Sequence, residues 1–189
     1  MYLHRPEQRI GETMSGIIGA AGSKSGVIER KETSAIRYRL ASGSTGAQDP
    51  LDGWELSLPV EFSVGYTYSS TLVTHSSGVF TFGQTGYYSI SSIITGQQQT
   101  NDATWAKISH EMTDSSGVDW GAVTFNYTAL ALNAYSSISN TSLVKVEDLA
   151  VDKFKITSVS EDVTTYWQFE GTGAAPTQSY IDFIRLGGL

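Results

Sequence analysis

A stretch of aromatic and β-branched residues from Ser77 to Thr95 restricts this chain to folds built from short strands. Residues 79–82 read Val-Phe-Thr-Phe, and residues 87–95 carry two tyrosines and three isoleucines among hydroxyl side chains. The Gly-Gln-Thr-Gly sequence between them supplies residues that favour turns. The stretch therefore predicts two strands that form a hairpin through a tight turn.

The remainder of the chain continues the pattern of short strands. With about ten strands at even spacing and no convincing amphipathic helix, the sequence predicts an all-β sandwich. Pro59 favours an edge position for the strand that contains it. The other expected strands are residues 34–40, 54–62, 66–73, 104–112, 122–135, 142–146, 154–159, 164–169 and 178–186.

Three segments resemble the complement globular-head and tumour-necrosis-factor-like (TNF-like) jelly-roll family. Residues 78–81 match its Gly-x-Phe-Thr strand, and residues 179–186 resemble its closing strand, with Asp182 where the family usually has glycine. Residues 149–156 resemble the segment before a late strand, with Val151 replacing glycine. The matches span residues 57–189. The resemblance implies a jelly-roll sandwich that forms homotrimers, binds partners and catalyses no reaction.

In such trimers, aromatic side chains lie along the threefold axis. The candidates for this trimer seam are Tyr66, Tyr88 and Tyr127.

The N-terminal part differs in composition from the rest. Glycine and serine dominate residues 15–28, and residues 41–50 have the composition of a hinge, which predicts an extended anchoring arm over residues 1–50 and a jelly-roll knob over residues 51–189. The first forty residues hold seven basic and four acidic side chains, so the arm either docks on an acidic partner or is simply an exposed tail. The expected anchoring residues are Ile17, Ile18, Val27, Ile28, Arg30 and Lys31. The glycine-rich stretch also resembles N-terminal segments of structural proteins from tailed bacteriophages.

Charge and composition exclude several classes of function. Residues 41–189 hold five basic and fifteen acidic side chains, which opposes nucleic-acid binding through general electrostatics. No apolar run is long enough to span a bilayer, and no secretory signal pattern is visible. The absence of cysteine excludes disulfides and thiolate chemistry, and it favours assembly inside a reducing cell.

No arrangement of residues points to catalysis. The three histidines, His4, His75 and His110, are interpreted as structural, and no Gly-x-Ser-x-Gly elbow is present. Residues 114–119 carry two aspartates around Ser-Ser-Gly, which fits turn chemistry better than a calcium loop. We therefore expect no catalytic residue, no cofactor and no metal.

Exposed loops are the expected place for a ligand. Amides, hydroxyls and an indole in residues 96–102 and 113–120 suit sugars or polar protein surfaces. The four tryptophans either form a sugar-binding platform or belong to the core and the subunit seam. The candidate ligand-loop residues are Gln97, Gln98, Gln99, Asn101, Asp102, Asp114, Asp119 and Trp120.

These features together predict a non-enzymatic virion protein of a tailed phage, namely a trimeric capsid decoration or cement protein anchored by its arm. It would assemble in the host cytoplasm and lie on the particle surface, with capsid or baseplate proteins and a cell-surface glycan or protein as partners, and with neither nucleic acid nor membrane insertion. One alternative is a tail fibre or receptor-binding module, although the chain has no heptads or fibre repeats to make a shaft. A carbohydrate-active enzyme or lectin is a further alternative.

Overall fold

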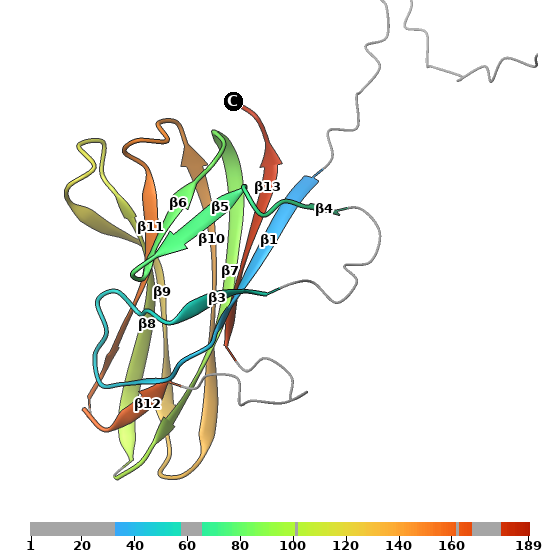
Figure 1. Cartoon of the computed structure of the whole chain (residues 1–189). Coiled ribbons are helices and arrows are strands. Elements are labelled where there is room, and N and C mark those ends of the chain that lie inside the picture. The colour runs from blue at the N-terminus through green and yellow to red at the C-terminus, as the bar shows by residue number, and fades with distance from the viewer. Residues whose placement is uncertain (1–32, 58–65, 101, 162, 168–178) are drawn as a thin grey trace, which may run out of the picture. The chain divides into compact units, whose positions relative to one another are not determined.

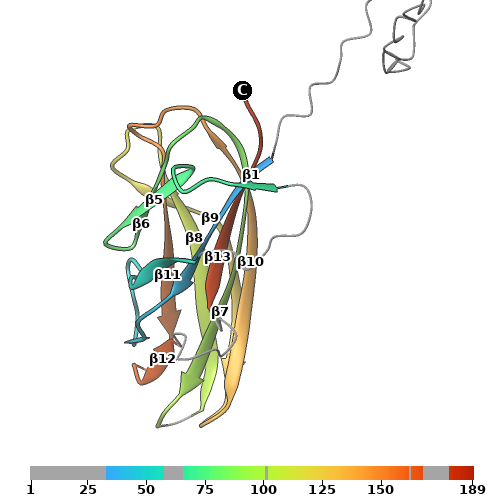
Figure 2. The ribbon, with the colours of Figure 1, turned by 45° about the vertical axis from the view of Figure 1, so that its right-hand side comes forward.

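The protein is a sandwich of two β-sheets (Figure 1). The structure is a computed structural model, and it describes residues 33–57, 66–100, 102–161, 163–167 and 179–189. Strands are the only regular elements among these residues, so the all-β prediction is confirmed. Figure 2 shows β13, β7 and β10 of the first sheet on one side and β5, β6 and β11 of the second sheet on the other.

The first sheet, sheet A, is organised around the long strand β7. Along one edge β7 pairs with β10, and along the other it pairs first with β13 and then with β12. All pairings are antiparallel except that of β1 with β4. The order is β2-β12-β7-β13-β1-β3. The strands are β1 (Thr33–Leu40), β2 (Ser44–Thr45), β3 (Trp54–Ser57), β4 (Tyr66–Tyr68), β7 (Gly86–Gln98), β10 (Tyr135–Val146), β12 (Thr165–Trp167) and β13 (Tyr180–Gly187).

The second sheet, sheet B, has five antiparallel strands in the order β5-β6-β11-β8-β9. The two sheets close over a shared core, because each strand turns alternate residues inward. The strands are β5 (Val73–Ser76), β6 (Val79–Phe82), β8 (Ala103–Thr113), β9 (Trp120–Leu130) and β11 (Lys153–Ser160).

Aromatic rings from both sheets fill the centre of the core. Phe183 of sheet A lies with its ring centroid 5.0 Å from that of Phe80 and 5.6 Å from that of Phe154, both in sheet B. The Tyr38 hydroxyl donates a 2.7 Å hydrogen bond to the carbonyl oxygen of Val73, which joins β1 to β5. Fully burying a large side chain of this kind contributes about 1.5–3 kcal/mol, so these rings are a main source of stability.

The predicted hairpin of residues 79–95 is wrong, because β6 and β7 belong to different sheets. Residues 83–85 connect the end of β6 in sheet B to the start of β7 in sheet A, so they do not form the turn of a hairpin. The crossing is crowded: a side chain at Gly83 would lie 2.1 Å from the carbonyl oxygen of Thr71, and Gly86 has φ +142°. The turn residues were recognised correctly, but the pattern does not say which sheet the next strand joins.

The boundary between arm and knob also needs correction. β1 pairs with β13 over residues 34–39, and the backbone near Gln48 pairs with Ser158 of β11. Residues 33–50 therefore belong to the sandwich. The expected anchoring residues Ile17, Ile18, Val27, Ile28, Arg30 and Lys31 lie outside the described residues.

Candidate interaction surface

The outward side of sheet A presents hydroxyl and apolar side chains with several charged residues among them. Along β7, inward residues alternate with outward ones, so Tyr88 is buried whereas Tyr87 is exposed. The β10 register places Leu143 opposite Ser89 and Thr141 opposite Ser91. We call this surface the sheet A face; its residues are Arg37, Tyr87, Ser89, Ser91, Ile93, Ser139, Thr141, Leu143, Lys145, Tyr180, Asp182 and Ile184.

Small hydroxyl side chains run through the middle of the sheet A face, with larger apolar ones around them. Ser91 and Thr141 are joined by a 3.1 Å hydrogen bond between their hydroxyls. Leu143 leaves 68% of its surface exposed on β10, which pairs only with β7 among the described strands of sheet A. The face therefore combines hydroxyl groups with exposed apolar side chains.

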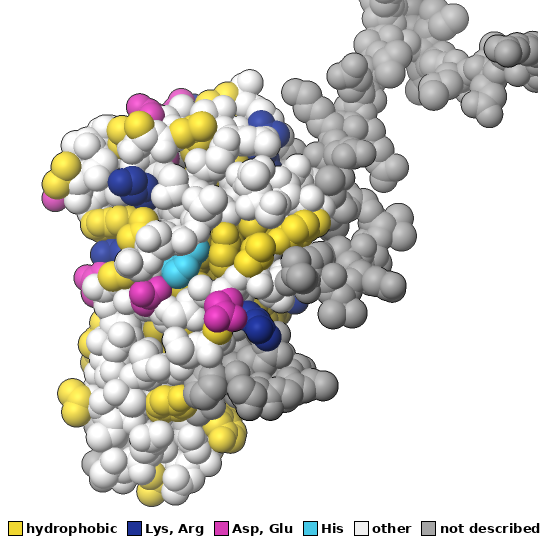
Figure 3. Space-filling model, in the orientation of Figure 1, with side chains coloured by type: hydrophobic (Ala, Val, Ile, Leu, Met, Phe, Trp, Pro, Cys, Tyr) yellow, Lys and Arg dark blue, Asp and Glu magenta, His cyan; other side chains and the backbone are white. Residues whose placement is uncertain are grey.

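The charges on the sheet A face are paired. Arg37 donates two 2.6 Å hydrogen bonds to the carboxylate of Asp182, and its guanidinium lies 4.2 Å from the ring centroid of Tyr180. The hydrogen bonds to Asp182 raise the pKa of Arg37 despite its partial burial. A bidentate pair of this kind can be covered by a partner without leaving an uncompensated charge. Figure 3, in the orientation of Figure 1, shows charged side chains scattered among many uncharged ones, consistent with a chain in which 16% of residues are charged.

A second exposed surface lies along β9, the edge strand of sheet B. Phe125 and Tyr127 point outward with 54% and 52% of their surfaces exposed, and their ring centroids are 5.7 Å apart. Trp105, Lys107, Tyr127 and Val159 line an open depression of about 440 Å³ beside them. Long apolar edge strands promote association, so natural proteins usually cover them.

The buried histidine is placed where no substrate can reach it. His110 is fully buried between the sheets, with Nε2 2.7 Å from the Ser92 hydroxyl and Nδ1 2.6 Å from the Ser142 hydroxyl. Burial lowers the pKa of His110 to about 3, so the imidazole is neutral at pH 7. This arrangement fits the structural role expected from the sequence.

His75 also serves the structure. Its Nε2 accepts a 3.0 Å hydrogen bond from the backbone N–H of Gly78, which holds the turn between β5 and β6. Burial lowers its pKa, and the nearby Asp52 carboxylate opposes that change. His4 lies outside the described residues.

The two predicted ligand loops lie at opposite ends of β8, so they cannot form one site. At the start of β8, Gln98 is fully buried, Gln97 is half-buried and Gln99 is exposed, while Asn101 lies outside the described residues. Asp102 is exposed and accepts a 2.6 Å hydrogen bond from the backbone N–H of Leu132.

The loop at the other end of β8 is a hydrogen-bonded turn. Asp114 accepts hydrogen bonds from the backbone N–H and the hydroxyl of Ser116, and these bonds lower the pKa of Asp114. The backbone carbonyl of Asp119 accepts from the N–H of Asp114, and the ring of Trp120 lies against the Lys155 ammonium. Within the described ranges, no three histidine or carboxylate side chains gather as a metal-binding group, and no helix is long and apolar enough to cross a bilayer.

The three proposed seam tyrosines do not share a surface. Tyr88 is fully buried, so it cannot line a seam; its hydroxyl donates a 2.7 Å hydrogen bond to the Gln84 carbonyl. Tyr127 is exposed on β9, and only the backbone of Tyr66 is described, in β4. Sequence reasoning missed Tyr87, Leu143 and the Arg37–Asp182 pair. The alternation of side chains along a strand would have indicated that Tyr87 is exposed, whereas the Arg37–Asp182 pair depends on the register between β1 and β13.

Comparison with known proteins supports the fold. No protein-family model and no curated protein matches the sequence. The structure is similar to that of Eiger TNF from S. frugiperda, with a TM-score of 0.61 and 11% identity over 84% of this chain and 96% of that chain. It is also similar to murine APRIL at pH 8.5, with a TM-score of 0.54 and 10% identity over 82% and 99% of the two chains. The chain therefore has the TNF-like jelly-roll fold.

Proposed function

We propose that this chain is a non-enzymatic structural module that forms a homotrimer and serves as a capsid decoration protein on the virion of a tailed phage. In this proposal the jelly roll forms the knob on the particle surface, and the residues before β1 anchor it to capsid proteins. The TNF-like fold and the fully buried position of His110 support a role without catalysis.

The observation that carries the proposal is the presence of two unlike exposed surfaces on one chain. The sheet A face spans β1, β13, β7 and β10 and carries hydroxyl, apolar and paired charged side chains, whereas β9 presents the exposed rings of Phe125 and Tyr127. When the β9 surface of one copy packs on the sheet A face of the next, the contact is heterologous, and it forms a ring when the rotation between copies closes. A threefold ring is the closed arrangement implied by the resemblance to TNF-like jelly rolls.

The virion setting is supported by the first part of the chain. The stretch of residues 15–28 resembles arms of phage structural proteins, and its apolar pairs, Ile17-Ile18 and Val27-Ile28, suit anchors that become ordered on a partner.

Sedimentation velocity of a matched pair of variants tests the association surface. Leu143→Glu places a carboxylate on the β10 side of the sheet A face and should convert the trimer to monomer, because the interface would have to bury an added charge. Val163→Glu is the control: Val163 is 79% exposed and lies outside the sheet A face and β9. Far-ultraviolet circular dichroism checks that both variants fold. A Leu143→Glu variant that stays trimeric would exclude the sheet A face as the seam.

Removal of residues 1–32 tests the anchor. The shortened chain retains β1 and therefore all described strands, so it should fold and trimerise but fail to join particles. Full occupancy on particles without these residues would contradict the anchoring role.

A receptor-binding module of the tail is the second candidate, and the depression beside β9 favours it. Trp105 and Tyr127 have ring centroids 6.2 Å apart at 74°, and such exposed rings can stack on sugar rings. In this case the wild-type chain should bind host-surface glycans, and Trp105→Ala should abolish that binding. Electron microscopy of particles carrying labelled protein separates a head position from a tail position.

A further inference from the structure

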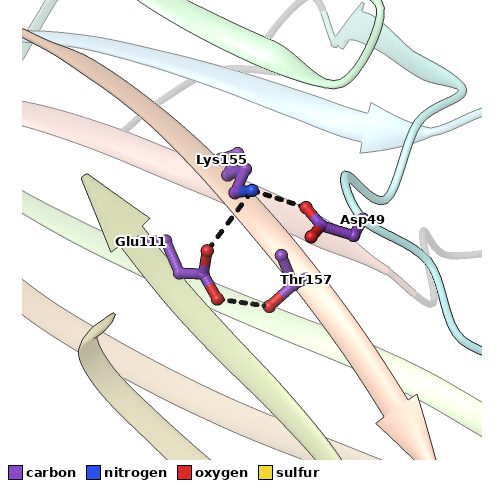
Figure 4. A network of polar contacts seen from close by, with 4 residues as sticks. All are labelled: Asp49, Glu111, Lys155 and Thr157. Carbon is purple, nitrogen blue, oxygen red and sulfur yellow. Dashed lines mark hydrogen bonds and ion pairs between the residues drawn. The ribbon is translucent and has the colours of Figure 1, made fainter. Parts of the chain in front are cut away.

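A buried lysine of sheet B lies between two carboxylates from distant parts of the chain (Figure 4). Lys155 Nζ, on β11, is 2.5 Å from Oδ1 of Asp49, in the segment between β2 and β3. The same nitrogen is 3.4 Å from Oε2 of Glu111 on β8. The other carboxylate oxygen of Glu111 accepts a 2.8 Å hydrogen bond from the hydroxyl of Thr157. Three elements thus bring one amine and two carboxylates together.

The surroundings differ from those of an ordinary surface ion pair. The side chain of Lys155 is only 8% exposed, and its ammonium lies 4.6 Å from the ring centroid of Trp120. The side chain of Asp49, by contrast, is 69% exposed, so its carboxylate is open to solvent. Lys145 and Glu147 form an ordinary surface ion pair for comparison. Lys145 Nζ lies 2.6 Å from Glu147 Oε1, and both side chains are well exposed.

The backbone holds the amine and the carboxylate in place. The N–H of Leu51 donates a 2.7 Å hydrogen bond to the carbonyl of Ile156, and Gln48 and Ser158 exchange two backbone hydrogen bonds of 2.8 and 2.9 Å. Asp49 is therefore fixed on both sides against the strand that carries Lys155. Fixed reactive groups have effective concentrations of about 10⁵–10⁸ M, which favours condensation even in water.

From this geometry we propose that Lys155 and Asp49 form an intramolecular isopeptide bond, with Glu111 transferring the protons. The product is an amide between Nζ of Lys155 and Cγ of Asp49. It would fasten the segment between β2 and β3 to β11 covalently and close a loop of the chain across the two sheets.

The reaction balances without a further reagent. Glu111 takes a proton from the ammonium of Lys155, and the nitrogen lone pair attacks Cγ of Asp49 to form the C–N bond. The C–O bond to one carboxylate oxygen then breaks, and that oxygen leaves as water. Both protons of the water come from the ammonium, one of them relayed by Glu111, and the amide nitrogen keeps the third. Thr157 is a positioning residue, because its hydrogen bond orients the Glu111 carboxylate.

Intact-mass spectrometry of the full chain tests the proposal, followed by mapping of tryptic peptides. The wild-type chain should be lighter than its sequence by one water, and digestion should yield a branched peptide that joins Asp49 to Lys155. Lys155→Arg should have its full sequence mass, whereas the control Lys145→Arg should still lose water. Asp49→Asn should form the same amide with release of ammonia, which gives a mass equal to that of the linked wild type.

Glu111→Gln tests the proton-transfer step, because an amide cannot accept the proton from the ammonium. This variant should fold, by circular dichroism, and keep its full mass. A wild-type chain at full sequence mass, with separate Asp49 and Lys155 peptides, would overturn the proposal and leave an ion pair. Loss of water in Glu111→Gln at the wild-type rate would overturn the assignment of Glu111.

Discussion

Tyr87 and Tyr88 show how one position along a strand separates a surface residue from a core residue. Tyr88 points between the sheets, where burial raises its pKa to about 12 and its ring lies 4.8 Å from that of Phe82. Tyr87 points away from the core and contributes to the sheet A face. Because side chains alternate along a strand, Tyr88 contributes to the stability of the core, whereas Tyr87 is available for association.

The buried imidazole of His110 predicts that stability falls in mild acid. Its folded pKa of about 3 lies below the ordinary value of 6.5, so between these values only the unfolded chain binds the proton. The contribution is therefore fully present above pH 6.5 and is lost progressively as the pH falls toward 3. Between pH 7.5 and pH 5 the loss should be about 2 kcal/mol.

Urea unfolding at the two pH values measures this loss, with His110→Gln as the reference. The variant removes the titrating group, so its stability should change less over the same interval. An equal change in wild type and variant would show that other groups, chiefly carboxylates, account for the acid sensitivity.

At the scale of elements, the crossing between β6 and β7 depends on glycine. Gly86 has φ +142°, and a Cβ there would lie 2.1 Å from the carbonyl oxygen of Gly187. Gly86→Ala should therefore lower the free energy of unfolding by about 1–3 kcal/mol. Gly121→Ala is the matched control, because a Cβ at Gly121 meets nothing within 4 Å.

Chemical denaturation of the two glycine variants decides the point. Equal free energies of unfolding for Gly86→Ala and Gly121→Ala would contradict the prediction, because they would show that the backbone around residue 86 accommodates a Cβ.

The sequence predicts strands far better than it predicts their partners. Alternation identified the strand that became β1, in which Ile36, Tyr38 and Leu40 are buried. The expected strand at residues 122–135 instead contains most of β9, a turn in which Asn133 has φ +55°, and Tyr135 at the start of β10. Pairing depends on contacts between residues far apart in the chain, and a local pattern holds no information on them. The same limitation explains why the Lys155 network, which joins residues 106 positions apart, was not foreseen.

At the scale of the whole molecule, the two sheets present surfaces of different kinds. The sheet A face is broad, with its one bidentate ion pair internally satisfied, and β9 offers exposed rings along an edge. In a closed ring of copies, each surface would cover the other, so neither would remain exposed to water. The stability of such an assembly comes mainly from apolar burial.

Because the assembly would be held mainly by apolar burial, its association should depend little on salt. Exposed charge pairs are screened within about 8 Å at physiological ionic strength, whereas apolar contacts are not. The trimer should therefore persist between low and moderate sodium chloride concentrations in sedimentation experiments. Dissociation caused by moderate salt would indicate an interface held by charges instead.

Size-exclusion chromatography with light scattering, applied to the unaltered full chain at micromolar concentration, tests the central claim most directly. The account predicts a single species with three times the chain mass of 20.4 kDa, unchanged on dilution through the micromolar range. A species with the mass of one chain would contradict self-association through the sheet A face and β9.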